Sequence, residues 1–210
     1  MIMNTLKNAL ATICTLSALG LASCGPLVEL PGSGEAPSHF TLKMPDSAGA
    51  DGVTADWKLF VDEPRVPGML RMDRVAVKSG ERETEYLAGA RWADRTPELL
   101  QAYWVRLLQE QGFSNIFGGD DIEVLTDHNL RVTVQLFQAE FDGSDVVGHV
   151  RVHAVLLKNR PVEAVSRKTF DVKARVAGGG KQDIVAAIND ALDGASLEMV
   201  HWLQAQSPTS

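Results

Sequence analysis

Alternating apolar and polar residues mark most of the strands expected in this chain. Short alternations, separated by Pro, Gly and charged residues, occupy the first half at residues 40–42, 57–61, 70–78 and 86–92. Three longer alternations follow in the second half, at residues 130–136, 149–157 and 166–176. A period of two places every second side chain on one face of a strand. Because the links between the last three are short and rich in turn residues, we expect an antiparallel meander.

Two segments instead have the 3.6-residue period of amphipathic helices. The first begins at Thr96, a capping residue, with Pro97 in its first turn, and Gly112 stops it. Its apolar residues share one face: Leu99, Leu100, Tyr103, Trp104, Leu107 and Leu108. The second begins near Gln182 or Asp183, and its apolar stripe comprises Val185, Ile188, Leu192, Ala195, Met199 and Trp202. Each stripe predicts a helix that packs on a core.

The order of elements is therefore strands, a helix, three strands and a second helix. This order predicts an α+β fold, with a largely antiparallel sheet and two helices packed on one face. We expect the folded domain to extend over residues 39–205, followed by a frayed tail at 206–210. The domain is long enough to bury a core of its own.

The first 23 residues have the pattern of a secretory signal. Lys7 is their only charged residue, and an uncharged apolar run follows at 9–22. That run is shorter than the ~20 residues that a membrane-spanning helix needs. The residues before Cys24 match a bacterial lipobox, in which a branched apolar residue and two small residues precede the cut: Leu21, Ala22 and Ser23. We therefore predict that the thiol of Cys24 receives a diacylglycerol and becomes the mature N-terminus.

Acyl chains on Cys24 would attach the protein to a membrane through lipid alone. Two or three chains hold firmly, since each buried CH₂ adds ~0.8 kcal/mol. Residues 24–38 are rich in Gly, Pro and Ser, and we expect them to form a flexible tether. Gly25, rather than Asp, follows the cysteine, which favours the outer membrane of a Gram-negative bacterium, with the domain facing the periplasm.

Composition narrows the function further. Lys and Arg total 20, and Asp and Glu total 27, which gives a net charge of −7. Residues 1–23 hold one Lys and no acid, so the mature chain keeps 19 basic and 27 acidic residues, a charge of −8. An acidic surface argues against nucleic-acid binding. The other cysteine, Cys14, leaves with the signal, so no thiol remains for a disulfide, a metal or a nucleophile.

No catalytic set, metal site or cofactor motif can be defined from the spacing. His149 and His153 lie four residues apart on an expected strand, too far apart to share a metal, and we expect them to be solvated or half-buried. The Gly-rich segment 178–181 lacks the spacing of a phosphate loop. Asp120 and Asp121 offer too few oxygen ligands for calcium. We therefore expect no enzymatic activity.

The residues between positions 61 and 113 carry a resemblance to a known family. Their pattern is a Val-Pro segment that leads into a strand, an aromatic strand that ends in Trp-Ala, and then a helix: Val66–Pro67 with Leu70, Tyr86 to Trp92–Ala93, and Pro97 to Gln111. Together with the lipobox, the three later strands and the last helix, this pattern resembles the ABC-type transport auxiliary lipoproteins, which include the PqiC-like lipoproteins.

The resemblance implies a non-catalytic role in lipid transport across the cell envelope. Members of the family work with an ABC permease and ATPase in the inner membrane and with MCE-domain proteins that span the periplasm. The implied cargo is phospholipid or another hydrophobic compound, and ATP is hydrolysed on another subunit. Some relatives form rings, so the resemblance also implies that a homo-oligomer is feasible.

A docking surface for the partner is expected within residues 63–72. Met and Pro near arginines are typical of interfaces, which makes four residues candidates for partner binding: Val66, Pro67, Met69 and Leu70. An equally weighted alternative is that these residues seat the strand in the core. Three other functions stay open, namely a lipid carrier with its own cavity, an envelope scaffold, and a hydrolase whose residues converge only in space.

Overall fold

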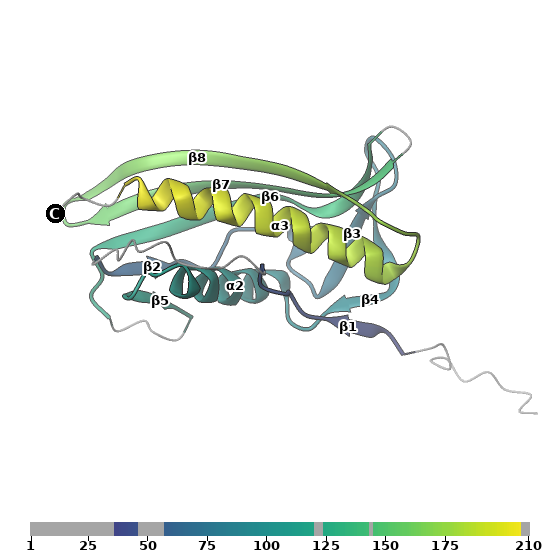
Figure 1. The fold of residues 1–210 in the computed structure, drawn as a ribbon, viewed down its shortest axis with the longest axis horizontal. Helices are drawn as coiled ribbons and strands as arrows, with labels where there is room; N and C mark the ends of the chain where they lie inside the picture. The colour runs from purple at the N-terminus through teal and green to yellow at the C-terminus, as the bar shows by residue number, and fades with distance from the viewer. Residues whose placement is uncertain (1–35, 46–56, 120–123, 143–144, 207–210) are drawn as a thin grey trace, which may run out of the picture. The chain divides into compact units, whose positions relative to one another are not determined.

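The computed structural model describes residues 36–45, 57–119, 124–142 and 145–206 (Figure 1). The chain divides into two units, Met1–Ala36 and Pro37–Ser210, and every helix and strand given below belongs to the second. The expected signal, the lipobox and most of the expected tether lie outside the described residues.

Eight strands form one mixed sheet. They are β1 (Ser38–Phe40), β2 (Leu59–Val61), β3 (Arg74–Lys78), β4 (Thr84–Trp92), β5 (Ile116–Gly118), β6 (His128–Asp142), β7 (Asp145–Asn159) and β8 (Val162–Arg175). The three longest strands pair antiparallel in chain order, β6 with β7 and β7 with β8. The predicted meander is therefore confirmed, and the fold is α+β.

The shorter strands extend the sheet from the other side of β6. β2 pairs parallel with His128–Leu130 near one end of β6, and β3 pairs parallel with Gln138–Glu140 near the other. β4 pairs antiparallel with β3, whereas β1 pairs parallel with β4 and β5 pairs parallel with β2. These parallel contacts are short and the antiparallel ladders of β6, β7 and β8 are long, so the sheet is largely antiparallel, as predicted.

Among the described residues, two α-helices complete the core, α2 (Thr96–Glu110) and α3 (Lys181–Gln204). The apolar stripes predicted for both are buried along their whole length. Thr96, however, does not cap α2. Its Oγ1 donates to the carbonyl of Met72 over 3.1 Å, and the N-cap residue, Arg95, makes no side-chain cap bond. The hydroxyl therefore ties the helix to the loop before β3 rather than to its own first turn.

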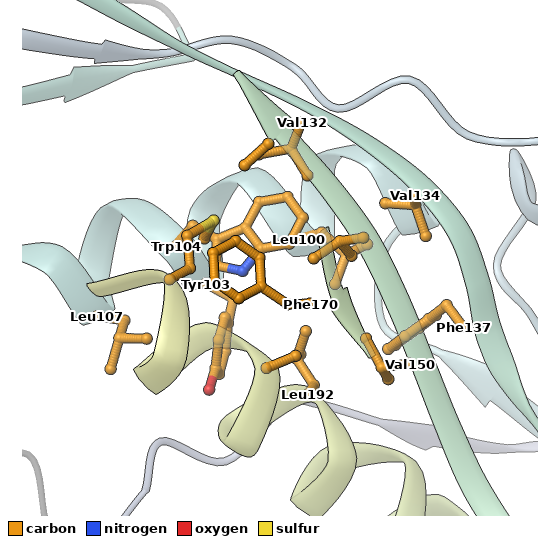
Figure 2. Packing of buried hydrophobic residues seen from close by; sticks show 14 of the residues in the cluster. Leu100, Tyr103, Trp104, Leu107, Val132, Val134, Phe137, Val150, Phe170 and Leu192 are labelled. Atoms are coloured by element: carbon orange, nitrogen blue, oxygen red, sulfur yellow. The ribbon is translucent and has the colours of Figure 1, made fainter. Parts of the chain in front are cut away.

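Both helices lie on one face of the sheet. α3 packs against β6, β7 and β8, and α2 is bonded to α3 by Trp104 Nε1, which donates to Ser196 Oγ over 2.9 Å. Figure 2 shows side chains of both helices meeting those of the long strands, such as Leu192 of α3 and Phe170 of β8. This arrangement confirms the predicted placement of the helices.

A close approach between α3 and β7 depends on Gly148. A Cβ atom at this position would lie 2.2 Å from the carbonyl oxygen of Ala187 and 2.4 Å from the backbone nitrogen of Ile188. The helix backbone therefore rests directly on the strand, with no side chain between them. On the helix side, a Cβ at Gly194 would meet Val172 of β8 at 3.0 Å, so a second glycine serves the same close packing.

Candidate functional site

The folded unit begins at β1, beside the expected tether. Ser38, predicted as the last tether residue, is the first residue of β1, which pairs with Ala90–Trp92 at an edge of the sheet. The lipid-attachment residue Cys24 and its lipobox lie outside the described residues and stay predictions. The expected tether therefore joins the folded unit at the sheet edge formed by β1.

The four predicted docking residues do not share one environment. Val66 and Leu70 belong to the core, with 9% and 3% of their surface exposed. Pro67 is exposed, and Met69 is half-buried against the core. Two of the four residues thus seat the segment, as the alternative held, while Pro67 and Met69 remain at or near the surface. Met72, which is 46% exposed, adds an apolar side chain to the same segment.

The backbone of this segment is fixed at both ends. Arg65 continues the path of β2 along β6, where its N–H donates to the Val132 carbonyl over 3.0 Å and its carbonyl accepts from the Val134 N–H over 2.8 Å. A 3₁₀ turn, η1 (Gly68–Leu70), follows in place of the predicted start of a strand. Its Met69 carbonyl accepts from the Tyr86 hydroxyl over 3.0 Å. These bonds hold the segment against both β6 and β4.

A polar hollow of about 210 Å³ opens beside the segment. Three arginines from separate parts of the chain line it, namely Arg65 after β2, Arg71 after η1 and Arg95 before α2. The rest of the lining is Glu63 and three buried apolar residues, Pro64, Val66 and Pro97. Arg65 and Arg71 are the arginines near Met and Pro that favoured a docking surface within residues 63–72, whereas Arg95 was not singled out from the sequence. Arg95 is 24 positions after Arg71, and only the fold brings it to the other two.

The arginines around this hollow differ in their partners. Arg95 pairs with Glu98 one turn along α2. Arg91, outside the hollow, donates two bonds to Asp73, and this pairing holds the pKa of the Asp73 carboxyl below its usual value. By contrast, the guanidinium groups of Arg65 and Arg71 have no ion-pair, hydrogen-bond or ring partner among the described residues. The hollow therefore presents two cations that form no ion pair with a described side chain, and the acid Glu63 lines it with them.

A second charged cluster surrounds His149 on the face of the sheet opposite the helices. His149 is only 7% exposed, with Nδ1 2.8 Å from a Glu140 oxygen and Nε2 2.6 Å from an Asp171 oxygen. The expectation that this histidine is solvated or half-buried is therefore wrong, because the two carboxylates that share it were not visible in the spacing. His153 is half-buried, as expected, and its Nδ1 lies 3.0 Å from the Thr169 hydroxyl.

The carboxylate of Glu140 is stabilised by this cluster. Burial raises the pKa of Glu140, but hydrogen bonds from His149, Gln138 and Lys173 more than offset it, so the pKa lies below its usual value. The network joins all three long strands, since Glu140 is on β6, His149 on β7 and Lys173 on β8. Every charged group in the network faces an opposite charge, so we interpret the network as one that stabilises the pairing of the three strands.

A polar pair also lies between the helices. The Tyr103 hydroxyl donates to the Asp193 carboxylate, which accepts a second bond from Asn189 over 3.0 Å. Burial raises the pKa of Asp193, and these two bonds lower it only in part. Burial and the neighbouring carboxylate likewise raise the pKa of Tyr103. The same Asn189 exchanges two hydrogen bonds with the backbone of Lys43, which ties the segment after β1 to α3.

Within the part of the chain that the structure describes, no three His, Cys, Asp or Glu side chains gather closely enough to hold a metal ion. None of the helices in that same part is both long and apolar enough to cross a membrane. The Gly-rich link before α3 is bonded to the first turn of that helix, since the Gly180 N–H donates to the Asp183 carboxylate over 3.0 Å. Asp120 and Asp121 lie outside the described residues.

Comparison with known proteins places the chain by family and fold. The model of a family described as ABC-type transport auxiliary lipoprotein component matches residues 40–200. None of the curated proteins matches the chain.

Solved structures with a similar fold include the following two. The crystal structure of protein XCC0632 from Xanthomonas campestris superposes with a TM-score of 0.70 at 22% identity, covering 80% of this chain and 96% of the other. That of an uncharacterized protein superposes with a TM-score of 0.63 at 16% identity, covering 80% and 99%. At these identities the likeness shows the fold alone.

Proposed function

The chain belongs to the family of ABC-type transport auxiliary lipoproteins, and from this premise we propose that it is a non-catalytic subunit of an intermembrane lipid-transport system. Acyl chains on Cys24 hold it at the outer membrane, and its folded unit faces the periplasm. There it docks the MCE-domain partner of an ABC permease and ATPase. Hydrolysis of ATP is assigned to the ATPase, and phospholipid or another hydrophobic compound is the cargo.

The family match carries this proposal, because it extends over nearly all of the second unit, from β1 to the last turns of α3. The lipobox at Leu21–Cys24 supports the anchor, since a lipid-anchored protein of an envelope transport system needs such a signal.

The segment around η1 is the proposed docking surface. Its exposed apolar side chains are those of Pro67 and Met72, and Met69 lies half-buried in the same segment. Methionine adapts to irregular partner surfaces, and arginines such as Arg65 and Arg71 are enriched in interfaces. Because hydrogen bonds already fix the backbone of the segment, little conformational entropy is lost when a partner docks.

A direct lipid carrier is the second candidate. A hollow of about 320 Å³ lies between the segment after β1 and α3, with Phe40, Met44 and Val185 among its apolar lining. This volume is at the small end of the ~300–1,000 Å³ of ligand pockets and suits at most part of a two-chain lipid. The core under the helices is filled by side chains (Figure 2). We therefore favour docking over carriage.

Affinity purification of the full chain from detergent-solubilised membranes tests the proposal. We expect an MCE-domain protein to co-purify, together with the permease and ATPase. A variant with Asp substituted for both Pro67 and Met72 should recover less of it. The matched control substitutes Asp for Val162 and Thr169, exposed residues of β8 far from η1 in the chain, and should recover the normal amount. Absence of any MCE-domain protein from the unmodified chain would contradict the proposal.

A further inference from the structure

The hollow beside η1 has the composition of an anion site. Arg65 and Arg71 line it without a partner among the described residues, and Arg95 completes the set although it also pairs with Glu98. The only acid in the lining is Glu63. We propose that this hollow binds the phosphate group of a phospholipid. The inference rests on the proposed function, because it assigns a lipid contact to a protein of lipid transport.

The choice of phosphate follows from the chemistry of the arginines. A guanidinium group presents its N–H donors in a planar fork that matches the oxygens of a phosphate two at a time. Arg65 and Arg71 leave two such forks for a ligand, whereas Arg95 already donates to Glu98. The phosphodiester of a phospholipid carries one negative charge on two non-bridging oxygens, which project from a tetrahedral phosphorus rather than lying in one plane with the adjoining chain, as the oxygens of a carboxylate do. It therefore suits Arg65, Arg71 and Arg95, which approach from separate parts of the chain.

The walls of the hollow strengthen this interaction. Pro64, Val66 and Pro97 are buried apolar residues that line it, so part of its wall is shielded from water. A lower local dielectric raises the attraction between guanidinium and phosphate. The backbones of Arg65 and Arg71 are held by hydrogen bonds to β6 and within η1, so only their side chains have to be ordered when a ligand binds. Binding therefore costs less ordering than it would on a flexible loop.

A lipid phosphate fits better than an acidic segment of a protein. Met72 follows Arg71 directly in the chain and is 46% exposed, so an exposed apolar residue is the immediate neighbour in sequence of one of the arginines. Basic and apolar residues side by side suit the boundary between headgroups and acyl chains. The predicted anchor at Cys24 would also keep the domain close to a membrane, where phospholipid is abundant. An acidic peptide requires no apolar rim.

Native mass spectrometry of the full chain, released from dodecyl maltoside micelles, tests the assignment. One arm dopes the micelles with dioleoylphosphatidylglycerol, a second adds inorganic phosphate, and a third adds a polyglutamate peptide. The test variant is Arg65→Gln with Arg71→Gln. The matched control, Arg82→Gln with Arg167→Gln, removes the same charge from exposed residues outside the hollow. Thermal unfolding of both variants verifies that they fold, which we expect because all four arginines are exposed.

We expect phosphatidylglycerol to be retained by the unmodified chain and the control. The test variant should bind it at least about tenfold more weakly, a loss of ~1.4 kcal/mol. Equal retention by the two double variants would overturn the inference. So would binding of inorganic phosphate or polyglutamate, but not of the lipid, at these arginines. Recovery of the MCE-domain protein is scored on the same preparations. A chain that recovers the partner but shows no arginine-dependent lipid binding therefore refutes this inference while leaving the proposed function standing.

Discussion

Substitution of Gly148 by alanine tests how the helices are seated on the sheet. The new Cβ would lie 2.2 Å from the Ala187 carbonyl oxygen. Restoring an ordinary contact of 3.4 Å requires a displacement of about 1.2 Å, and the atoms that must move are helix backbone rather than the end of a flexible side chain. α3 must therefore lift from β7 along the turn that contains Ala187 and Ile188.

The energetic cost follows from what that turn buries. Ile188 and Leu192 are 0% and 1% exposed, and they pack in the same core as Val150 and Phe170. A radial gap of ~1 Å forfeits a quarter to a half of the dispersion attraction across it, and overpacked cores lose about 1–3 kcal/mol or more. We expect Gly148→Ala to lower the free energy of unfolding by about 3 kcal/mol, at the upper end of this range, because backbone must move.

Urea unfolding followed by tryptophan fluorescence measures this loss, since Trp92 and Trp104 are fully buried reporters. With a slope of roughly 2 kcal/mol per molar urea, the midpoint should fall by about 1.5 M. The control is Gly179→Ala, an exposed position where a Cβ would meet nothing within 4 Å, and its midpoint should change little. Equal midpoints for the two variants would refute direct contact between α3 and β7.

Three further predictions concern charge and attachment. The pKa of Glu140 is lowered in the fold, so its contribution to stability is present above the usual value of 4.5 and is lost as pH falls through the lowered pKa. Glu140→Gln should lower the free energy of unfolding by roughly 1–3 kcal/mol at pH 7. The variant should also show a weaker loss of stability at acid pH than the unmodified chain. Burial raises the pKa of Asp193, so the charged carboxylate lowers the stability of the fold at pH 7. Asp193→Asn, whose amide oxygen still accepts from Tyr103, should unfold at the same or a higher urea concentration. A clearly lower unfolding midpoint would contradict a cost of burying the charge. Cys24→Ala should leave the circular dichroism spectrum unchanged but move the protein from the membrane to the soluble fraction, and its retention in membranes would exclude the lipid anchor.

The periodic spacing of apolar residues predicted the two helices and the faces that they bury. The stripes from Leu99 to Leu108 and from Val185 to Trp202 repeat over several turns, so they specify both the helices and their buried faces. β5 was missed, because three residues are too few for a period and Ile116–Gly118 pairs only through the long-range contact with β2. Thr96 was read as a cap from its position, whereas the Met72 carbonyl, 24 residues away, claims its hydroxyl.

The candidate site was harder to predict, because it too depends on contacts between residues far apart in the chain. Residue type alone did not separate Val66, which the fold buries, from Pro67, which it exposes. Arg65, Arg71 and Arg95 meet only because β2, η1 and α2 are packed together, and no local pattern in the sequence reports that packing. The burial of His149 between two carboxylates likewise arises from the register of three strands.

Site-specific photo-crosslinking in the living cell tests the proposed docking most directly. A photoreactive residue placed at Pro67, beside η1, should crosslink to the MCE-domain protein, because this exposed position lies on the proposed docking surface. The same residue at Thr169, exposed on β8, should give little of that product. An MCE-domain crosslink of equal yield from both positions, or none from Pro67, would contradict docking through this segment.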